Sequence, residues 1–287
     1  MNTSNQPPSK AASLPAQFDL SGRVALVTGG AGLLGAEFCQ TLAQAGAQVA
    51  VADLDAEAAQ RVAAGLNQPD STTLHALAVE SDVSQPESVQ RMLETTLKTF
   101  GRLDILVNSA ALDPKFDPQH SQRGVSGAFE DYPLEAWHQA LDVNLTGTFL
   151  CCQAAVAPML EQDGGVIVNI SSIYGLVGPD QRLYRRQGEP AQFKPVYYSV
   201  TKAGVLGLTR YLATYYAGKN IRVNALTPGG VFNGHDEQFL TAYAARTVLG
   251  RMAEKDELNG ALLFLVSGAS AYMTGANLVV DGGWTAW

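Results

Sequence analysis

A glycine-rich turn near the amino-terminal end constrains the fold of this chain more than any other feature. The apolar segment of residues 23–29 (RVALVTG) enters the turn at residues 28–35 (TGGAGLLG), and a helical pattern follows over residues 33–47. Such a turn between a buried strand and a helix lets the backbone approach a pyrophosphate, whose charge the helix N-terminus stabilises. A tight turn that binds nothing is the alternative, but the strand before the motif and the helix after it favour a dinucleotide site.

Apolar runs and helical patterns alternate along the rest of the chain. Further strands are predicted at residues 48–55, 75–83, 103–111, 164–172, 220–228 and 276–283. Helices are predicted between them at residues 56–66, 85–100, around 137–160 and around 196–217. Short buried strands separated by long helices predict an α/β fold: a single-domain Rossmann fold with a doubly wound parallel sheet and helices on both faces.

We predict one domain, covering residues 20–287. Residues 1–19 are polar and contain prolines, which is typical of a disordered tail. Two segments, 112–131 and 176–196, interrupt the alternation of strands and helices. Loops of this length in an α/β domain are usually either functional or disordered, and ligands bind at the carboxyl ends of the strands. We therefore predict two substrate-loop insertions.

Composition excludes several functions. The net charge is -8 and no basic block is present, so we predict no nucleic-acid partner. The sequence has neither a run of 18 apolar residues nor a secretory signal, which predicts a cytoplasmic protein without a membrane span. Three cysteines cannot form a disulfide framework, and Cys151 and Cys152 are expected to pack within a helix. The four histidines show no metal-ligand spacing, so no metal site is predicted.

An acidic residue at the end of the second strand predicts the cofactor. Asp53 lies 18 residues after Gly35, where a carboxylate can accept hydrogen bonds from an adenosine ribose and repels a 2′-phosphate. No Lys or Arg lies in residues 28–35 or beside Asp53, which favours NAD over NADP. An ordinary solvated Asp would leave that preference open. Asp82 and Val83 end the third strand, where an adenine ring would lie, although a plain turn Asp also fits.

Two adjacent tyrosines differ in what stands four residues later. A phenol with a pKa near ~10 is a poor base at neutral pH unless a cation stabilises its phenolate. Residues four apart share a helix face, which pairs Tyr198 with Lys202 but Tyr197 with the uncharged Thr201. Tyr198 is therefore the candidate acid/base, and Tyr197 is expected to pack or to line the site.

The segment Tyr198-Ser199-Val200-Thr201-Lys202 resembles the YxxxK signature of the short-chain dehydrogenase/reductase family. Other motifs follow in the family's order: the glycine turn, Asn108-Ser109-Ala110-Ala111 where the family often has NNAG, Asn144, Ser171-Ser172, Pro228-Gly229-Gly230 and the closing residues 280–284. The resemblance covers nearly everything after the tail.

The resemblance implies a role for each matching residue. Tyr198 would be the general acid/base, Lys202 would lower its pKa and hold the nicotinamide ribose, and Ser172 would bind the substrate oxygen, with Ser171 as its competitor. Asn144 would position a water in the proton relay. The implied cofactor-binding set is Gly29, Gly32, Leu33, Leu34, Gly35, Asp53, Leu54, Asp82, Val83, Asn108, Ala110, Tyr198, Lys202, Pro228, Gly229 and Val231.

Three features depart from the family pattern. Leu33 stands where the single-domain branch has glycine in TGxxxGxG; the glycines fit TGxxGxxG of the extended, sugar-nucleotide-modifying branch, whose long C-terminal region is missing here. Ser172 and Tyr198 are 26 positions apart, whereas the family joins them by a much shorter loop. Val231-Phe232-Asn233 follows Pro228-Gly229-Gly230, where the family often supplies a Thr.

These departures resemble one group within the family. The turn TGGAGLLG, the segment NSAALDPKFD, SSIYG before a long insertion and the terminal DGGWTAW are similar to the dehydrogenases of flagellin-modification and nonulosonic (legionaminic-type) acid sugar loci. That similarity implies a sugar or sugar phosphate as substrate.

The two insertions carry many polar side chains. The first contributes Asp113, Lys115, Phe116, Asp117 and His120, and the second Arg182, Tyr184, Arg185, Arg186 and Lys194. Arginines near the reactive tyrosine suit a phosphate or carboxylate on the substrate, although a solvated surface or a subunit contact is equally compatible. The predicted substrate residues are Lys115, Tyr174, Arg185 and Arg186, and residues 229–247 are expected to form a lid.

The sequence thus predicts an NAD-dependent oxidoreductase that interconverts a secondary alcohol and a ketone of a small-molecule substrate, a sugar or sugar phosphate. A 3-oxoacyl or other small-carbonyl reductase is the enzymatic alternative, which would favour NADPH and a shorter, apolar loop. A non-catalytic NAD-binding regulatory or scaffold protein is the alternative from another class. The family resemblance further implies a homo-oligomer, either a dimer or a tetramer.

Overall fold

A computed structural model describes residues 14–67, 74–113, 128–185 and 192–287. These residues form a seven-stranded, fully parallel sheet with the order β3-β2-β1-β4-β5-β6-β7. The predicted α/β Rossmann fold is confirmed. The strands are β1 Val24–Thr28, β2 Gln48–Asp53, β3 Ala76–Glu80, β4 Ile105–Asn108, β5 Gly165–Ile170, β6 Ile221–Pro228 and β7 Asn277–Val280.

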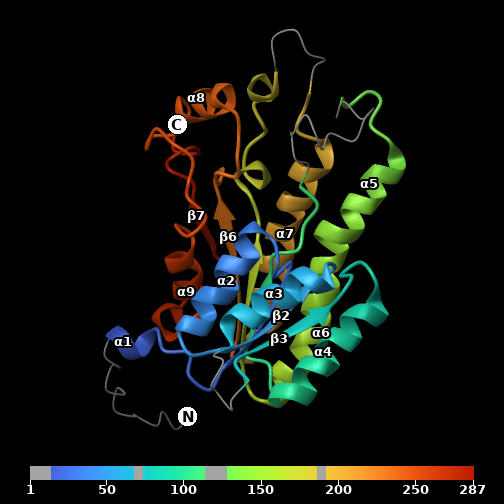
Figure 1. Ribbon diagram of the computed structural model, residues 1–287, viewed down its shortest axis with the longest axis vertical. Helices are drawn as coiled ribbons and strands as arrows, with labels where there is room; N and C mark the ends of the chain where they lie inside the picture. The colour runs from blue at the N-terminus through green and yellow to red at the C-terminus, as the bar shows by residue number, and fades with distance from the viewer. Residues whose placement is uncertain (1–13, 68–73, 114–127, 186–191) are drawn as a thin grey trace, which may run out of the picture.

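Helices cover both faces of the sheet (Figure 1). One apolar cluster joins the sheet to α2 (Leu33–Gln44), α3 (Ala56–Leu66) and α9 (Asn259–Val266). The other joins it to α4 (Pro86–Phe100), α6 (Gly147–Glu161) and α7 (Val196–Tyr215). Cys151 and Cys152 are buried in this second cluster with free thiols, so they pack within α6 as predicted.

A continuous helical segment leads into the sheet's second layer. It comprises α5 (Leu134–Leu141), a π-helical stretch η1 (Asp142–Thr146) and α6. By length and composition Leu134–Glu161 could cross a membrane, but 44% of its apolar window is buried inside the protein. We therefore interpret it as a core helix of the fold. A short helix α1 (Leu14–Gln17) lies within the stretch for which the sequence predicts a tail, and residues 1–13 lie outside the described residues.

A third apolar cluster lies beyond the carboxyl ends of the strands. It is built from the 3₁₀ turns η2 (Ile173–Gly175) and η3 (Gln181–Tyr184), from α8 (Glu237–Ala244) and from the C-terminal segment. Tyr184, from the second insertion, packs on Phe239 of α8 with ring centroids 5.8 Å apart. Tyr243 of α8 stacks on Trp284 with centroids 4.5 Å apart. The insertion is therefore partly built into the interior, and the cluster forms a wall at the end of the sheet where ligands bind.

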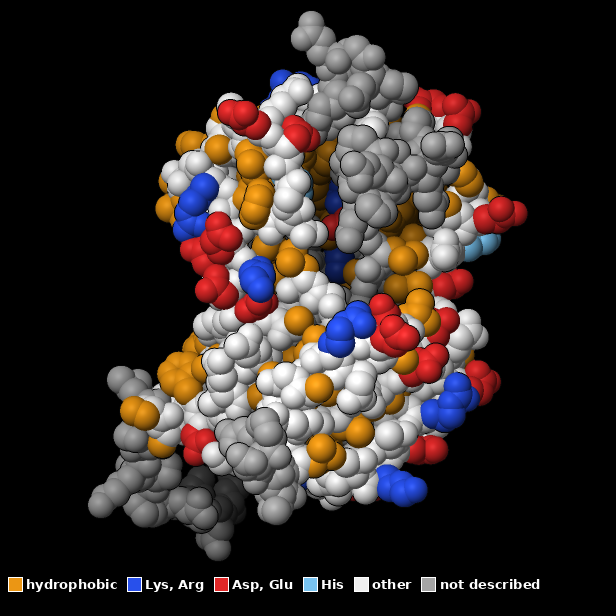
Figure 2. Space-filling view, viewed as in Figure 1, with side chains coloured by type: hydrophobic (Ala, Val, Ile, Leu, Met, Phe, Trp, Pro, Cys, Tyr) orange, Lys and Arg blue, Asp and Glu red, His pale blue; other side chains and the backbone are white. Residues whose placement is uncertain are grey.

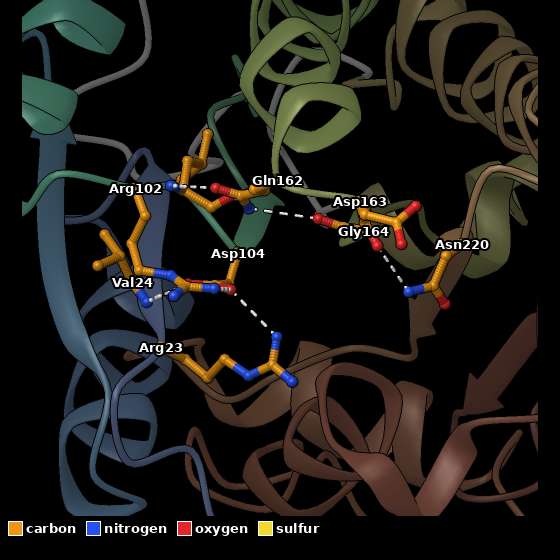
Figure 3. Close-up of polar contacts among 9 residues, drawn as sticks. Arg23, Val24, Arg102, Asp104, Gln162, Asp163, Gly164 and Asn220 are labelled. Atoms are coloured by element: carbon orange, nitrogen blue, oxygen red, sulfur yellow. Dashed lines mark hydrogen bonds and ion pairs between the residues drawn. The ribbon is translucent and has the colours of Figure 1, made fainter.

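A buried carboxylate fastens the opposite end of the sheet (Figure 3). Asp104 precedes β4, is 2% exposed, and accepts hydrogen bonds from Arg102, from Arg23 and from the backbone N–H of Val24 on β1. Burial raises the pKa of Asp104, but these hydrogen bonds outweigh burial and hold the pKa below its ordinary value. The side chain of Gln162 bonds the backbone of Leu103 beside it. This network joins β1, β4 and the end of α6.

Candidate active site

The glycine-rich turn lies where the strand order reverses. β2 and β3 continue from β1 in one direction and β4 to β7 in the other, so the crevice of the sheet opens between β1 and β4. Gly29 has φ +63°, and a Cβ on it would lie 2.7 Å from Cα of Ala110, which follows β4. A Cβ on Gly35 would lie 1.9 Å from the carbonyl oxygen of Gly29. The two glycines are thus required by the tight turn itself.

Asp53 closes the same turn from β2. Its Oδ2 accepts a hydrogen bond of 2.9 Å from the Ala31 N–H, and its Oδ1 accepts one of 3.1 Å from the Asp55 N–H. A carboxylate has about four acceptor sites, so ribose hydroxyls can bond it in addition. Leu54 beside it is exposed, and Leu33 begins α2 at the surface. A glycine-rich turn, a helix N-terminus and an acidic strand end fit the adenosine and pyrophosphate of a nicotinamide dinucleotide.

Two other predicted cofactor residues use their side chains within the protein. The Asp82 carboxylate accepts from both the N–H and the hydroxyl of Ser84, so it stabilises a turn. Asn108 is buried, and its amide nitrogen donates to Oδ1 of Asn169 and to Sγ of Cys152. The Asn108 side chain therefore faces α6, and only its backbone is left to face a cofactor.

Tyr198 lies in the first turn of α7, at the inner edge of the third cluster. Burial raises the pKa of Tyr198 well above its ordinary value, the Asp113 carboxylate adds to this effect, and the nearby Ser172 hydroxyl acts in the opposite direction. Lys202 is buried one turn later, with its Nζ 5.8 Å from the Tyr198 ring centroid. The ammonium donates to the carbonyl of Ile170 at the end of β5, at 2.9 Å.

Lys202 titrates closer to neutrality than an ordinary lysine. Burial lowers the pKa of Lys202 to about 8; Asp113 acts in the opposite direction, and the nearby Lys194 ammonium acts in the same direction as burial. A desolvated cation beside a phenol is an arrangement typical of acid/base sites.

The two serines that end β5 have different partners. Ser171 donates through its hydroxyl to the carbonyl of Lys202 at 2.8 Å, so it anchors α7 to the sheet. Ser172 accepts a hydrogen bond of 3.2 Å from the Tyr174 N–H, and its hydroxyl is near enough to Tyr198 to lower the pKa of that phenol. The structure therefore turns Ser172 toward the tyrosine and Ser171 away from it.

Asn144 lies within the π-helical stretch η1, a conformation that occurs frequently at functional sites. It is 1% exposed, and its Oδ1 accepts from the Leu112 N–H at 2.6 Å. Its amide nitrogen donates to the Leu112 carbonyl at 3.0 Å and to the Thr201 hydroxyl at 3.4 Å. Asn144 thus joins the segment after β4 to α7, directly beside Tyr198.

Tyr197 and Tyr174 surround the candidate acid/base. Tyr197 is 6% exposed and packs on Tyr132 at a centroid distance of 6.1 Å, which makes it a packing residue. The Tyr174 ring stands edge-on to Tyr198 at 6.5 Å, and its hydroxyl accepts a hydrogen bond of 3.0 Å from the Tyr184 hydroxyl. Burial raises the pKa of Tyr174 to about 12. Tyr174 is one of the two predicted substrate residues that the structure describes, and it contacts Tyr198.

Two of the predicted arginines, Arg182 and Arg185, lie within the described residues, and each has a contact with another residue. Arg182 forms a two-point ion pair with Asp180, two residues earlier, and Arg246 pairs with the same carboxylate. Arg185 is exposed, and its carbonyl accepts from Gln238 of α8. Lys115 and Arg186 lie outside the described residues, as do Phe116, Asp117 and His120.

Among the described cations of the second insertion, Lys194 reaches Tyr198. Its Nζ lies 4.0 Å from the Tyr198 ring centroid, and the side chain is 8% exposed. It forms an ion pair with Asp113 from the first insertion, whose side chain is 53% exposed. Both residues stand in the predicted insertions, but their meeting at Tyr198 is not visible from spacing, since Pro195 separates Lys194 from the helix.

The segment after β6 packs against α8 and against the C-terminal part of the chain. Gly230 N–H donates to the hydroxyl of Tyr243 on α8, and Val231 forms a bridge with Ala253. Pro228 ends β6 and Gly229 lies against the backbone of Asp281. Figure 2 shows a hollow in the upper half of the molecule, with Lys or Arg side-chain atoms visible inside it. Among the described residues, no group of three or more His, Cys, Asp and Glu side chains could hold a metal.

Residues 30–285 match the family model described as enoyl-(acyl carrier protein) reductase. The chain is 38% identical to D-threitol dehydrogenase of Mycolicibacterium smegmatis over 93% of this chain and 95% of that protein. It resembles the crystal structure of a short-chain type dehydrogenase/reductase from Mycobacterium marinum, at 35% identity, TM-score 0.80 and coverage of 96% and 99%. Gluconate 5-dehydrogenase of Burkholderia cenocepacia, solved with NADP and tartrate, shares 29% identity at TM-score 0.79 over 95% and 99% of the two chains.

Proposed function

Because the chain belongs to the short-chain dehydrogenase/reductase family, we propose that it interconverts a secondary alcohol and a ketone of a polyol, sugar or sugar phosphate, with NAD as the preferred cofactor. Tyr198 is the acid/base of this reaction. The carrying observation is the surroundings of Tyr198: the Ser172 hydroxyl, which lowers its pKa, Lys202 one helical turn away, and Asn144, which bonds Thr201 of the same helix.

The proton moves through Tyr198. In the oxidation direction the phenolate takes the hydroxyl proton of the substrate, while the Ser172 hydroxyl holds the same oxygen. Lys202 stabilises the phenolate electrostatically, and its remaining N–H groups are available to the ribose of the cofactor. A nicotinamide dinucleotide held beside Lys202 would supply the hydride-transfer chemistry that complements this proton transfer.

Asp53 supports the preference for NAD. Its carboxylate sits at the end of β2 with both oxygens already oriented by backbone N–H groups, so a 2′-phosphate would meet a fixed negative charge. Gluconate 5-dehydrogenase was solved in complex with NADP, so membership of the family does not decide between the two cofactors. The proposed preference of this chain for NAD therefore rests on Asp53.

Polar groups at the site support a hydroxyl-rich substrate. The half-exposed Asp113 and the hydroxyl of Tyr174 face the region of Tyr198 and offer hydrogen-bonding groups to neighbouring hydroxyls. D-threitol dehydrogenase, by its name, acts on a sugar alcohol, which supports the same class. The narrower resemblance to flagellin-modification and nonulosonic acid dehydrogenases rests on sequence motifs and extends the proposal to sugar phosphates.

The family also leads us to propose a homo-oligomer. Phe149 on α6 and Tyr211 and Tyr215 on α7 are large apolar side chains at the surface of the single chain. Light scattering during size-exclusion chromatography should give a dimeric or tetrameric mass, and a monomer would contradict this part of the proposal.

The test is a substrate screen. Polyols, sugars, sugar phosphates and, in reverse, a 3-oxoacyl thioester are offered with NAD(H) and with NADP(H), and dinucleotide absorbance is followed. The proposal predicts turnover with at least one hydroxyl-rich substrate and a higher kcat/KM with NAD. Turnover confined to the acyl thioester would identify a small-carbonyl reductase. Dinucleotide binding without any turnover would favour a regulatory protein.

A further inference from the structure

The insertion between Ser172 and Tyr198 places a second ammonium group, that of Lys194, next to the tyrosine. The Nζ of Lys194 lies 4.0 Å from the Tyr198 ring centroid, closer than Nζ of Lys202 at 5.8 Å. We propose that Lys194 is a positioning residue for the reaction: held by Gln181 and Asp113, its ammonium stabilises the phenolate of Tyr198. This inference rests on the proposed function of Tyr198 and adds a residue to it.

The position of Lys194 is fixed from three sides. The Gln181 side chain makes reciprocal hydrogen bonds with the Lys194 backbone, accepting from its N–H at 2.8 Å and donating to its carbonyl at 3.1 Å. The ammonium forms an ion pair with Asp113. Pro195 follows, caps α7 in an extended conformation and leads directly into the helix that carries Tyr198. A long, flexible side chain is thereby kept over one ring.

The chemistry of this contact favours the charged tyrosine. A cation over the face of an aromatic ring is attracted by its negative quadrupole, and the attraction grows when the ring carries a phenolate charge. Lys194 is 8% exposed, so solvent screens this interaction only weakly. The surroundings otherwise disfavour the phenolate, since burial raises the pKa of Tyr198 well above its ordinary value.

The remaining titratable groups around Tyr198 come from four segments. Asp113 raises the pKa of Tyr198, and Tyr197 and Tyr174 act in the same direction, whereas the Ser172 hydroxyl lowers it. Tyr184 donates a hydrogen bond to the Tyr174 hydroxyl and is coupled to Tyr198 through the charges of the two phenols. Burial lowers the pKa of Lys202 to about 8, so Lys202 offsets these effects only while it keeps its proton. Lys194, whose Nζ lies nearer the Tyr198 ring, is the second ammonium group beside the phenol among the described residues.

The experiment compares Lys194→Met, Lys194→Arg and Asp113→Asn with the wild type, using the best substrate from the screen. The pH dependence of kcat/KM for alcohol oxidation gives the limb on which activity rises as Tyr198 loses its proton. We expect Lys194→Met to move this limb to higher pH by about 1 unit, because a neighbouring charge shifts a pKa by that order. Lys194→Arg should restore it, and Asp113→Asn should move it to lower pH.

A spectroscopic titration tests whether this limb of the pH profile comes from the ionisation of Tyr198. The tyrosinate absorbance of each protein minus that of the same protein carrying Tyr198→Phe isolates Tyr198 from the other tyrosines and from Lys202. The isolated transition should shift with the kinetic limb. Lys219→Met is the matched control, because Lys219 is exposed beyond the far end of α7, about 26 Å along the helix from Tyr198.

Three results would overturn the inference. A higher KM in Lys194→Met with an unmoved pH profile would make Lys194 a substrate contact. Loss of thermal stability with unchanged kinetics would make it an anchor of the insertion, and failure of Lys194→Arg to restore the profile would exclude the charge as the cause. The proposed function fails separately, when Tyr198→Phe retains full turnover.

Discussion

Ser171 and Ser172 are adjacent in the sequence but face different residues of α7: the Ser171 hydroxyl donates to the Lys202 carbonyl at 2.8 Å, whereas the Ser172 hydroxyl lies beside Tyr198 and lowers its pKa. At the end of β5, Ser171 therefore stabilises the packing of α7 on the sheet, whereas Ser172 belongs to the candidate active site. The alternation of side chains along an extended backbone is the physical cause.

This pair predicts opposite mutant phenotypes. Ser172→Ala should lower kcat by about 10²–10³, because it removes a hydrogen-bond donor from the reacting oxygen. Ser171→Ala should lower the free energy of unfolding by about 1 kcal/mol, the usual contribution of a hydrogen bond, with a much smaller effect on kcat. Steady-state kinetics and denaturant unfolding of both variants check this. Equal losses of kcat in the two variants would contradict the assignment.

The glycine turn predicts a selective loss of dinucleotide binding. Ala at Gly29 would be strained at φ +63° and would bring its Cβ to 2.7 Å from Ala110. We expect Gly29→Ala to weaken NADH binding, measured by fluorescence titration. Gly207→Ala is the matched control: Gly207 is exposed within α7 with open space around it, and Ala there should stabilise the helix by up to about 1 kcal/mol. Unchanged NADH affinity in Gly29→Ala would argue against a cofactor at this turn.

Asp53 predicts the cofactor ratio. Asp53→Asn keeps an oxygen for the Ala31 N–H but removes the charge that would repel a 2′-phosphate. We expect the ratio of kcat/KM for NADP to that for NAD to rise about tenfold, which corresponds to a modest Coulomb term at a partly solvated site. Asp55→Asn is the control, since Asp55 caps α3 through the Ala58 N–H. A wild-type preference for NADP would refute the role given to Asp53.

The Asp104 network predicts acid sensitivity of the fold. The folded pKa of Asp104 is lowered, so its contribution to stability is complete above the ordinary carboxyl pKa of about 3.9 and is lost as the pH falls through the folded value. Asp104→Asn should lower the free energy of unfolding at pH 7 by roughly 2 kcal/mol, because charged hydrogen bonds are lost, and the deficit relative to wild type should shrink in acid. Urea unfolding at pH 7 and at low pH measures both. A deficit that grows in acid would contradict the lowered pKa.

The fold was largely predictable because its signals are local. Helix α3 spans the predicted residues 56–66, and each predicted strand is present. Except for β6, the strands end earlier than predicted. For example, β3 ends at Glu80, because Asp82 turns toward Ser84 and Ser88. A prediction based only on the pattern of apolar residues easily extends a strand into the polar residues that follow it.

The site was predictable only in its helical part. Tyr198 and Lys202 are linked by helix spacing, so their pairing follows from the sequence. Lys194 is brought to Tyr198 by Gln181 and Asp113, which come from two other segments. Arg182 was expected near the substrate, but Asp180, two residues earlier, pairs with it locally. Contacts that depend on how two loops meet leave no periodic trace in a sequence.

The most direct test of the account is turnover and dinucleotide binding in Tyr198→Phe, with Tyr197→Phe as the matched control. Loss of the phenol should lower kcat by about 10²–10⁴, the usual contribution of a general acid/base, while NADH binds with nearly unchanged affinity. Tyr197→Phe should retain turnover, since the Tyr197 ring packs on Tyr132. Full turnover in Tyr198→Phe would contradict the proposed chemistry.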